Sequence, residues 1–177
     1  MKIHVIYGLG IALAGFLLML LLNLAGLHSV ERFLLGMILG FLAGITVTII
    51  GLVLGIRAVR KSRGSAPFSY GQALVAGILI SVVNGIFGAG LQQLYTQVIN
   101  PHFNETVIQW TQAMMEKAEM PPDEIENAIA EAREKSGAGT QIRNGIIGAV
   151  IFGTLCSLIV AIFLRRPGES ADAPAPA

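Results

Sequence analysis

Charged side chains are scarce in this chain. Asp, Glu, Lys and Arg together make up 13% of its 177 residues, against about 25% in an average soluble domain. Twelve basic and eleven acidic residues give a formal net charge of +1, so the basic surplus that nucleic-acid binding needs is missing. We therefore expect no nucleic-acid partner.

Cysteine and clustered metal-ligating residues are equally scarce. Cys156 is the only cysteine, which excludes an internal disulfide framework. His4, His28 and His102 are far apart, and no His, Cys, Asp or Glu group has the spacing of a metal site. The sequence also lacks a Ser/His/Asp set, a phosphate-binding loop and a dinucleotide fingerprint. We expect a protein that is not an enzyme and has no cofactor and no bound metal.

Apolar residues are what the chain has in excess. Hydrophobic types account for 54% of it and the mean hydropathy is +0.69, too apolar for one water-soluble globule. Four stretches almost free of charged residues reach the roughly 20 residues that cross the hydrocarbon core as a helix. These predicted spans are 5–27, 33–56, 73–99 and 142–164. The sequence thus predicts an all-α integral membrane protein, a four-helix bundle in the lipid bilayer.

Local signals place several ends of these spans. Ser69 and Gln72 have the spacing of a capping box at the start of the third span. Asn100-Pro101 ends the same span, because the residue before proline is pushed out of the helical region. The short connection 28–32 makes the first two spans an antiparallel hairpin. Residues 167–177, rich in Ala and Pro, are expected to be a disordered cytoplasmic tail.

Basic residues near the span ends indicate the orientation of the chain, because cytoplasmic loops carry an excess of Lys and Arg. One side of the predicted bundle has seven of them: Lys2, Arg57, Arg60, Lys61, Arg63, Arg165 and Arg166. On the other side, Arg32 is followed by four basic residues spread over a segment with eight carboxylates. We expect both termini in the cytoplasm and residues 100–141 outside it. The cluster at 57–63 also has a second interpretation, a site for anionic lipid head groups.

Small residues recur at every fourth position in three spans, which places them on one face of each helix. In lipid, such stripes allow helix backbones to approach closely. They are Gly36, Gly40, Gly44 and Thr48 in the second span, Ala73, Gly77, Ser81, Gly85 and Ala89 in the third, and Gly145, Ala149, Gly153, Ser157 and Ala161 in the fourth. The pattern predicts a compact bundle. Two alternatives stay open: the stripes line a conduit, or they join copies of the chain in a homo-oligomer.

Asn84 is a polar residue in the middle of the third span, and its own helix does not satisfy the hydrogen-bonding groups of its side chain. Ser and Thr can bond the carbonyls of their own helix, whereas an amide has four hydrogen-bonding sites. We expect Asn84 to bond a neighbouring helix, with solute binding or permeation as the alternative. No carboxylate, His or Arg lies in the middle of a span, which disfavours an ion-coupled transporter.

Residues 100–141 have the pattern of an acidic helical hairpin. Apolar residues recur in its first part at helical intervals; they are Phe103, Val107, Trp110 and Met114. Met120-Pro121-Pro122 separates this helix from a second one, whose start is favoured by Pro122 and the carboxylates after it. The apolar face either packs within the chain, as a roof over the bundle, or binds a partner protein. Adsorption on lipid is disfavoured by the eight carboxylates.

Four short segments point to a known family. They are Phe68-Ser69-Tyr70-Gly71-Gln72-Ala73 before the third span, Ile99-Asn100-Pro101-His102-Phe103 after it, Asp123-Glu124-Ile125-Glu126 in the acidic segment, and Ser157-Leu158-Ile159-Val160-Ala161-Ile162-Phe163-Leu164-Arg165-Arg166 at the end. In order and spacing these segments resemble the bacterial four-span membrane proteins of the domain of unknown function 4199 (DUF4199) family. The resemblance covers residues 1 to about 166 and implies a bacterial inner-membrane location. It brings no activity, substrate or catalytic residue.

These observations favour a non-enzymatic membrane protein that serves interaction or assembly in a bacterial envelope. Its acidic outer hairpin would contact an envelope protein partner. The alternative is a small oligomeric channel or carrier for a solute, with Asn84 and the small-residue stripes near that solute.

Overall fold

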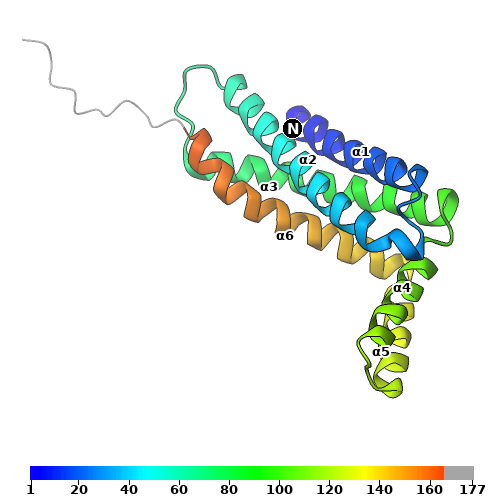
Figure 1. Ribbon diagram of the computed structural model, residues 1–177. Helices are drawn as coiled ribbons and strands as arrows, with labels where there is room; N and C mark the ends of the chain where they lie inside the picture. Colours follow the sequence, from blue (N-terminus) through cyan, green and yellow to red (C-terminus); the bar gives the residue numbers. More distant parts are fainter. Residues whose placement is uncertain (166–177) are drawn as a thin grey trace, which may run out of the picture.

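The computed structural model describes residues 1–165, and every secondary-structure element in them is a helix (Figure 1). Arg166 and the tail 167–177, for which we expect a topological role and disorder, lie outside the described residues. Four helices are long and apolar enough to cross a membrane: α1 (Lys2–Leu24), α2 (Phe33–Ser62), α3 (Tyr70–Leu94) and α6 (Ala138–Leu164). The predicted all-α fold with four spans is confirmed, and the chain is a multi-pass membrane protein.

Large apolar side chains cover the outer surface of these helices. Leu21 on α1 and Phe163 on α6 are 63% and 77% exposed. Such surfaces are unfavourable in water and favourable against lipid acyl chains. The exposure therefore agrees with the membrane location that composition predicts.

Two of the spanning helices, α2 and α6, extend beyond their predicted apolar segments. The sequence predicts that α2 ends at Ile56, but it continues to Ser62, because Arg and Lys are good helix formers and the left-handed geometry first appears at Gly64, with φ +65°. In the same way α6 begins at Ala138 instead of Ile142. Most of the basic cluster at 57–63 is thus part of a helix and not of a loop.

Both ends of α3 follow the predicted signals. The Oγ of Ser69 accepts from the backbone N–H of Gln72 at 3.3 Å, and the Ser69 N–H donates to the Gln72 Oε1 at 3.1 Å, so the capping box is confirmed. At its other end α3 continues into η2 (Tyr95–Ile99), a single π-helical turn. The N–H of Asn100 donates to the Tyr95 carbonyl at 2.8 Å, and the helix stops before Pro101.

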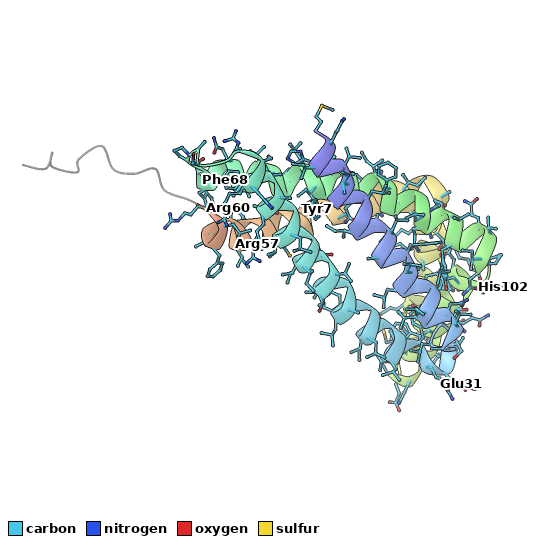
Figure 2. The ribbon with its side chains drawn as sticks, turned by 90° about the horizontal axis from the view of Figure 1, so that it is seen from above. Tyr7, Glu31, Arg57, Arg60, Phe68 and His102 are labelled. Atoms are coloured by element: carbon cyan, nitrogen blue, oxygen red, sulfur yellow. The ribbon has the colours of Figure 1, made fainter. Side chains whose placement is uncertain are left out.

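The four long helices form one bundle with two different ends. Figure 2 shows Arg57 and Arg60 at one end and Glu31 and His102 at the other. We call them the basic end and the hairpin end. Most of the fully buried apolar side chains form one cluster toward the basic end and come from α2, α3, α6 and the α2–α3 connection; they include Leu52, Ile56, Phe68, Ala73, Ile80 and Ala161.

The acidic segment projects from the hairpin end, away from the long helices (Figure 1). It consists of α4 (Phe103–Lys117) and α5 (Pro122–Lys135), so the predicted two helices and their separation at the prolines agree with the structure. Pro122 opens α5, with Asp123 and Glu124 in its first turn, where carboxylates interact favourably with the helix dipole. A short 3₁₀ turn, η1 (Val30–Arg32), lies between α1 and α2.

Candidate functional site

The hairpin is attached to the bundle through a junction of polar side chains. His28, in the connection between α1 and α2, hydrogen-bonds through its Nδ1 to the hydroxyl of Tyr95 in η2. The side-chain amide of Asn100 donates to the same hydroxyl at 3.2 Å and to the Oδ1 of Asn23 on α1 at 3.1 Å. These bonds connect the ends of α1 and α3 immediately before the hairpin begins.

The junction is partly shielded from solvent, and His28 and Asn100 are half-buried. The side chain of Tyr95 has no exposed surface. Burial lowers the pKa of the His28 imidazole below its usual value, because the charged ring would lose hydration that the junction does not replace. His28 therefore favours the neutral form, which can both donate and accept hydrogen bonds.

Aromatic rings pack the first turn of α4 against the junction. The ring of Phe103 lies 5.0 Å from His28 and 5.4 Å from Tyr95, centroid to centroid. Phe33, at the start of α2, lies 6.1 Å from Phe103 and 5.3 Å from Trp110. Aromatic pairs in this range stabilise by about 0.5–1.5 kcal/mol beyond their burial. Two of the four residues considered as a partner surface thus contact the bundle of their own chain.

The rest of the apolar face of the hairpin is mostly covered as well. Val107 is half-buried, whereas Met114 is 43% exposed. Ile108 of α4 is 4% exposed and lies in the helix that packs along α5. The apolar residues of α5 that recur at helical intervals are half-buried; they are Ile125, Ala128, Ile129 and Ala132. The apolar face therefore packs chiefly within the chain.

Polar side chains fix the hairpin from two further sides. Arg133 on α5 forms an ion pair with Glu105 on α4, with 3.2 Å between Nη2 and Oε1. Gln141, in the first turn of α6, donates from Nε2 to the Oδ1 of Asn104 at 3.0 Å and accepts from the Nε2 of Gln93 at 3.0 Å. The hairpin is thus connected at its base to α1, α2, α3 and α6.

The opposite face of the hairpin is acidic and exposed. Glu131 pairs with Lys135 on α5, and this hydrogen-bonded ammonium lowers the pKa of the Glu131 carboxyl. Six other carboxylates have no cationic partner within residues 1–165; they are Glu116, Glu119, Asp123, Glu124, Glu126 and Glu134. All six side chains are exposed.

The basic residues stand at the other end of the bundle. Arg60 donates from Nη1 to the carbonyl of Leu164 at 3.3 Å, and the guanidinium of Arg63 lies 5.9 Å from the ring centroid of Phe68. The other described basic residues of this side are exposed; they are Lys2, Arg57, Lys61 and Arg165. Arg60 and Arg63 thus contribute contacts at this end, besides any topological role.

The α3–α6 seam, which we define by four facing pairs of small residues, is closely packed. They are Gly77 with Ser157, Ser81 with Gly153, Gly85 with Ala149, and Ala89 with Gly145. A Cβ added at Gly77 would lie 2.6 Å from the Ser157 Cβ, and one added at Gly153 would lie 2.5 Å from the Ser81 Cβ. Both serines are buried and donate to carbonyls of their own helices, at 2.9 Å from Ser81 and 2.6 Å from Ser157.

The glycines of α2 have less uniform surroundings. Gly36 lies against the carbonyl of Leu27, and a Cβ at Gly40 would lie 3.1 Å from the Leu22 Cδ1. A Cβ at Gly44 would meet no atom within 4 Å. The predicted stripe on α2 therefore lies against a carbonyl, against a side chain and against open space in turn.

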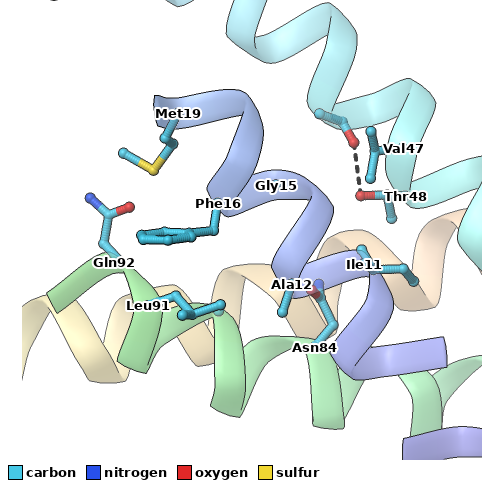
Figure 3. Close-up of a pocket in the computed structure, with 12 residues that line it drawn as sticks. Ile11, Ala12, Gly15, Phe16, Met19, Val47, Thr48, Asn84, Leu91 and Gln92 are labelled. Carbon is cyan, nitrogen blue, oxygen red and sulfur yellow. Dashed lines mark hydrogen bonds between the residues drawn. The ribbon is translucent and has the colours of Figure 1, made fainter. Parts of the chain in front are cut away.

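Open space at Gly44 belongs to a cavity of about 240 Å³ between α1, α2 and α3 (Figure 3). Its polar side chains are Asn84, Gln92 and Thr48. The Thr48 hydroxyl donates to the Gly44 carbonyl at 2.9 Å. The side chains of Asn84 and Gln92 have no hydrogen-bonding partner in the described part of the chain, so the partner helix expected for Asn84 is not found there. Apolar residues and glycines form the rest of the wall; they are Ile11, Ala12, Gly15, Phe16, Met19, Val47, Gly88 and Leu91, with Gly44.

Sequence reasoning does not find the junction or the second amide of the cavity. His28 and Tyr95 are 67 residues apart, and no local pattern predicts that they meet. Gln92 lies on the same face of α3 as Asn84, two turns later, which is the one signal that links them. Among residues 1–165, no group of three or more His, Cys, Asp or Glu side chains has the arrangement of a metal site.

One comparison with known proteins gives a match, and it covers nearly the whole chain. The model of a family described as "Protein of unknown function (DUF4199)" matches residues 6–166, which include the bundle and the hairpin. The resemblance found in the sequence is thereby confirmed. No curated protein and no solved structure matches the chain.

Proposed function

The chain belongs to the DUF4199 family, and we propose that it is a non-enzymatic protein of the bacterial inner membrane whose acidic hairpin binds a partner protein outside the cytoplasm. The observation that carries this proposal is the division of the hairpin into two faces. The apolar face of α4 packs against the bundle beside the junction and against α5. The other face of the hairpin presents carboxylates to solvent. A fixed element loses little conformational entropy when it binds, which favours affinity.

Charge indicates the chemistry of the partner. Six exposed carboxylates without a cationic partner in residues 1–165 create a negative surface. Such a surface steers and orients a basic protein surface and disfavours an acidic one. We therefore propose an envelope protein partner with a basic patch. Long-range attraction of this kind weakens with salt, because the Debye length is about 8 Å at 0.15 M.

The basic end supports a proposal for the orientation of the chain in the membrane. Arg57 and Arg60 lie at the end opposite the hairpin (Figure 2). Lys61 and Arg165 directly follow Arg60 and Leu164, which are hydrogen-bonded to each other. An excess of Lys and Arg is typical of cytoplasmic ends. We propose that both termini are cytoplasmic and that residues 100–141 are extracytoplasmic. Reporter fusions after Lys61 and after Glu119 test this, and finding both in one compartment would contradict it.

Photocrosslinking tests the docking proposal in intact cells. A photoreactive amino acid is placed at Gln109 on α4 or at Asn127 on α5, both exposed. We expect a discrete protein adduct from these positions. A photoreactive residue at Leu155, which is 55% exposed on α6, reports contacts at the apolar surface of the bundle and is the positional control.

Charge variants, with the photoreactive residue kept at Gln109 or Asn127, show whether the carboxylates are needed for binding the partner. Changing Glu116, Glu119, Glu124 and Glu126 together to Gln removes four charges, and changing them to Asp keeps the charges. We expect the adduct to disappear in the Gln variant and to persist in the Asp variant. An adduct of equal yield in both, or none beyond that from Leu155, would refute the proposal.

A second candidate function, a small oligomeric channel or carrier, is favoured by one observation, the cavity that contains Asn84. It expects solute flux from reconstituted vesicles that changes in Asn84→Leu. Leakage equal to that of empty liposomes would count against it.

A further inference from the structure

We propose that the cavity between α1, α2 and α3 is a binding site for a small uncharged molecule that has one hydrogen-bonding group on an apolar body. This deepens the second candidate function, because a carrier needs such a site. The site itself requires no transport, so binding without flux would contradict the carrier and leave the site standing.

The two amides in the wall determine the polar part of the ligand. Asn84 lies in the middle of α3 and Gln92 two turns closer to the hairpin end, and neither side chain has a hydrogen-bonding partner in the described residues. Both residues are half-buried, and at membrane depth, where water does not replace the missing bond, an amide without a partner is unfavourable. Because each amide both donates and accepts, one hydroxyl or carbonyl group of a ligand bonds whichever amide it reaches, and Asn84, in the middle of the span, is the one we test. Figure 3 shows the Asn84 amide beside Ala12 of α1, at the wall of the cavity.

The lining excludes charged ligands. None of the side chains around the cavity is acidic or basic. An ion transferred from water to this site would lose its hydration without gaining a counter-charge, which is strongly unfavourable. The ligand is therefore neutral, and its body meets Ile11, Phe16, Met19 and Leu91, which are apolar.

Size limits the ligand further. The cavity has a volume of about 240 Å³, whereas a cavity of about 150 Å³ in another protein holds benzene. There is room for one six-membered ring with one or two small substituents. Phenols and benzyl alcohols have this size, one hydrogen-bonding group and no charge at neutral pH.

The route that we propose for the ligand runs from the bilayer through a second cavity. A second cavity of about 280 Å³ shares Gly15, Met19 and Gly44 with the first and continues between α1 and α2 toward the hairpin end. Its rim includes Met37 and Phe41, which are 45% and 64% exposed on the apolar surface of α2. A neutral amphiphile dissolved in the membrane thus reaches the amides without crossing a charged region.

Ligand-observed ¹⁹F NMR tests the site on the full chain in lipid nanodiscs. The probes are 4-fluorophenol and 4-fluorotoluene, which have nearly the same shape and differ in having a hydroxyl or a methyl group. We expect a saturable shift of 4-fluorophenol that empty nanodiscs do not give. We expect 4-fluorotoluene to bind about two- to tenfold more weakly, the range for one neutral hydrogen bond, and Asn84→Leu to weaken 4-fluorophenol by a similar factor.

Two glycines on α3 supply a matched pair of variants. Gly88 lines the cavity and Gly90 is exposed outside it, and a Cβ at either meets no atom closer than 3.9 Å. Gly88→Leu fills the cavity and is expected to abolish the saturable shift, while Gly90→Leu retains it. This pair decides the question even where Asn84→Leu fails to insert. Equal binding by the two variants, equal affinity for the two probes, or a shift identical to that in empty nanodiscs would each overturn the proposal.

Discussion

The same sequence pattern of small residues produces a closed interface between α3 and α6 and a cavity beside α2. In the α3–α6 seam, a Cβ at Gly77 or Gly153 would overlap a serine of the facing helix. At Gly44, in the middle of α2, it would meet no atom within 4 Å. A glycine therefore permits close approach, but the residue opposite it decides whether close approach occurs.

Register explains the difference. In the α3–α6 seam both helices carry a stripe, and as the residue number rises by four on α3 it falls by four on α6, so small residues meet small residues at every turn. α1 presents larger side chains to α2 at the hairpin end, such as Leu22, whose Cδ1 would lie 3.1 Å from a Cβ at Gly40. Leu18 and Met19 line the space next to Gly44. Large side chains that face a glycine hold the backbones apart.

The largest effect on stability is expected in the α3–α6 seam. Gly77→Ala places a methyl group 2.6 Å from the Ser157 Cβ, so one helix must shift. Overpacking of this kind costs about 1–3 kcal/mol. Unfolding of the purified protein in detergent micelles measures it, with Gly90→Ala on the same helix, where a Cβ meets nothing within 4 Å, as the control. Equal stability of the two variants would show that the α3–α6 seam is not closely packed.

A second change at the same point is expected to restore stability. Ser157→Gly removes the side chain that the new methyl group meets, and the Ser157 hydroxyl bonds only its own helix. In the double variant with Gly77→Ala we expect recovery of about 1–2 kcal/mol, within the range of coupling between residues in contact. Ser81→Gly combined with Gly77→Ala is the control, because Ser81 faces Gly153. Rescue by both serine changes would show that the contact is not specific.

Beside the cavity, a Gly→Ala substitution is expected to stabilise the protein instead of destabilising it. Gly44→Ala adds a methyl group to open space and reduces the conformational freedom of the unfolded chain, which stabilises by about 0.4–1 kcal/mol. Gly55→Ala on the same helix is the comparison, since its Cβ would lie 2.5 Å from the Ile80 Cδ1 and 3.1 Å from the Tyr7 Cβ. The two variants are expected to shift the unfolding midpoint in opposite directions. Destabilisation by Gly44→Ala would mean that the cavity closes in the membrane.

Local features of this fold can be predicted from the sequence, whereas contacts between its helices cannot. Hydropathy places the four spans, Ser69 and Gln72 place the start of α3, and the prolines at 121–122 separate α4 from α5, because each of these signals is local. Whether Gly44 or Gly77 faces a small residue depends on the register of two helices, which a local pattern does not encode. The contact of His28 with Tyr95 depends on the whole path of the chain between them.

The smallest effect on stability is expected at the junction. His28 bonds to Tyr95 there and lines the second cavity, between α1 and α2. Burial holds the pKa of His28 below the ordinary value of 6.5. A disrupted junction therefore binds more protons than the native one once the pH falls below 6.5, and the stability of the junction decreases from there down to the native pKa.

Hydrogen exchange at pH 5 and pH 7.5, corrected for intrinsic rates, is expected to show faster opening of residues 28–33 and 95–103 at the lower pH. The α3–α6 seam at 77–89 contains no titratable group and serves as the internal control. Replacing His28 by Gln is expected to remove the pH dependence, and its persistence in that variant would assign it to another group.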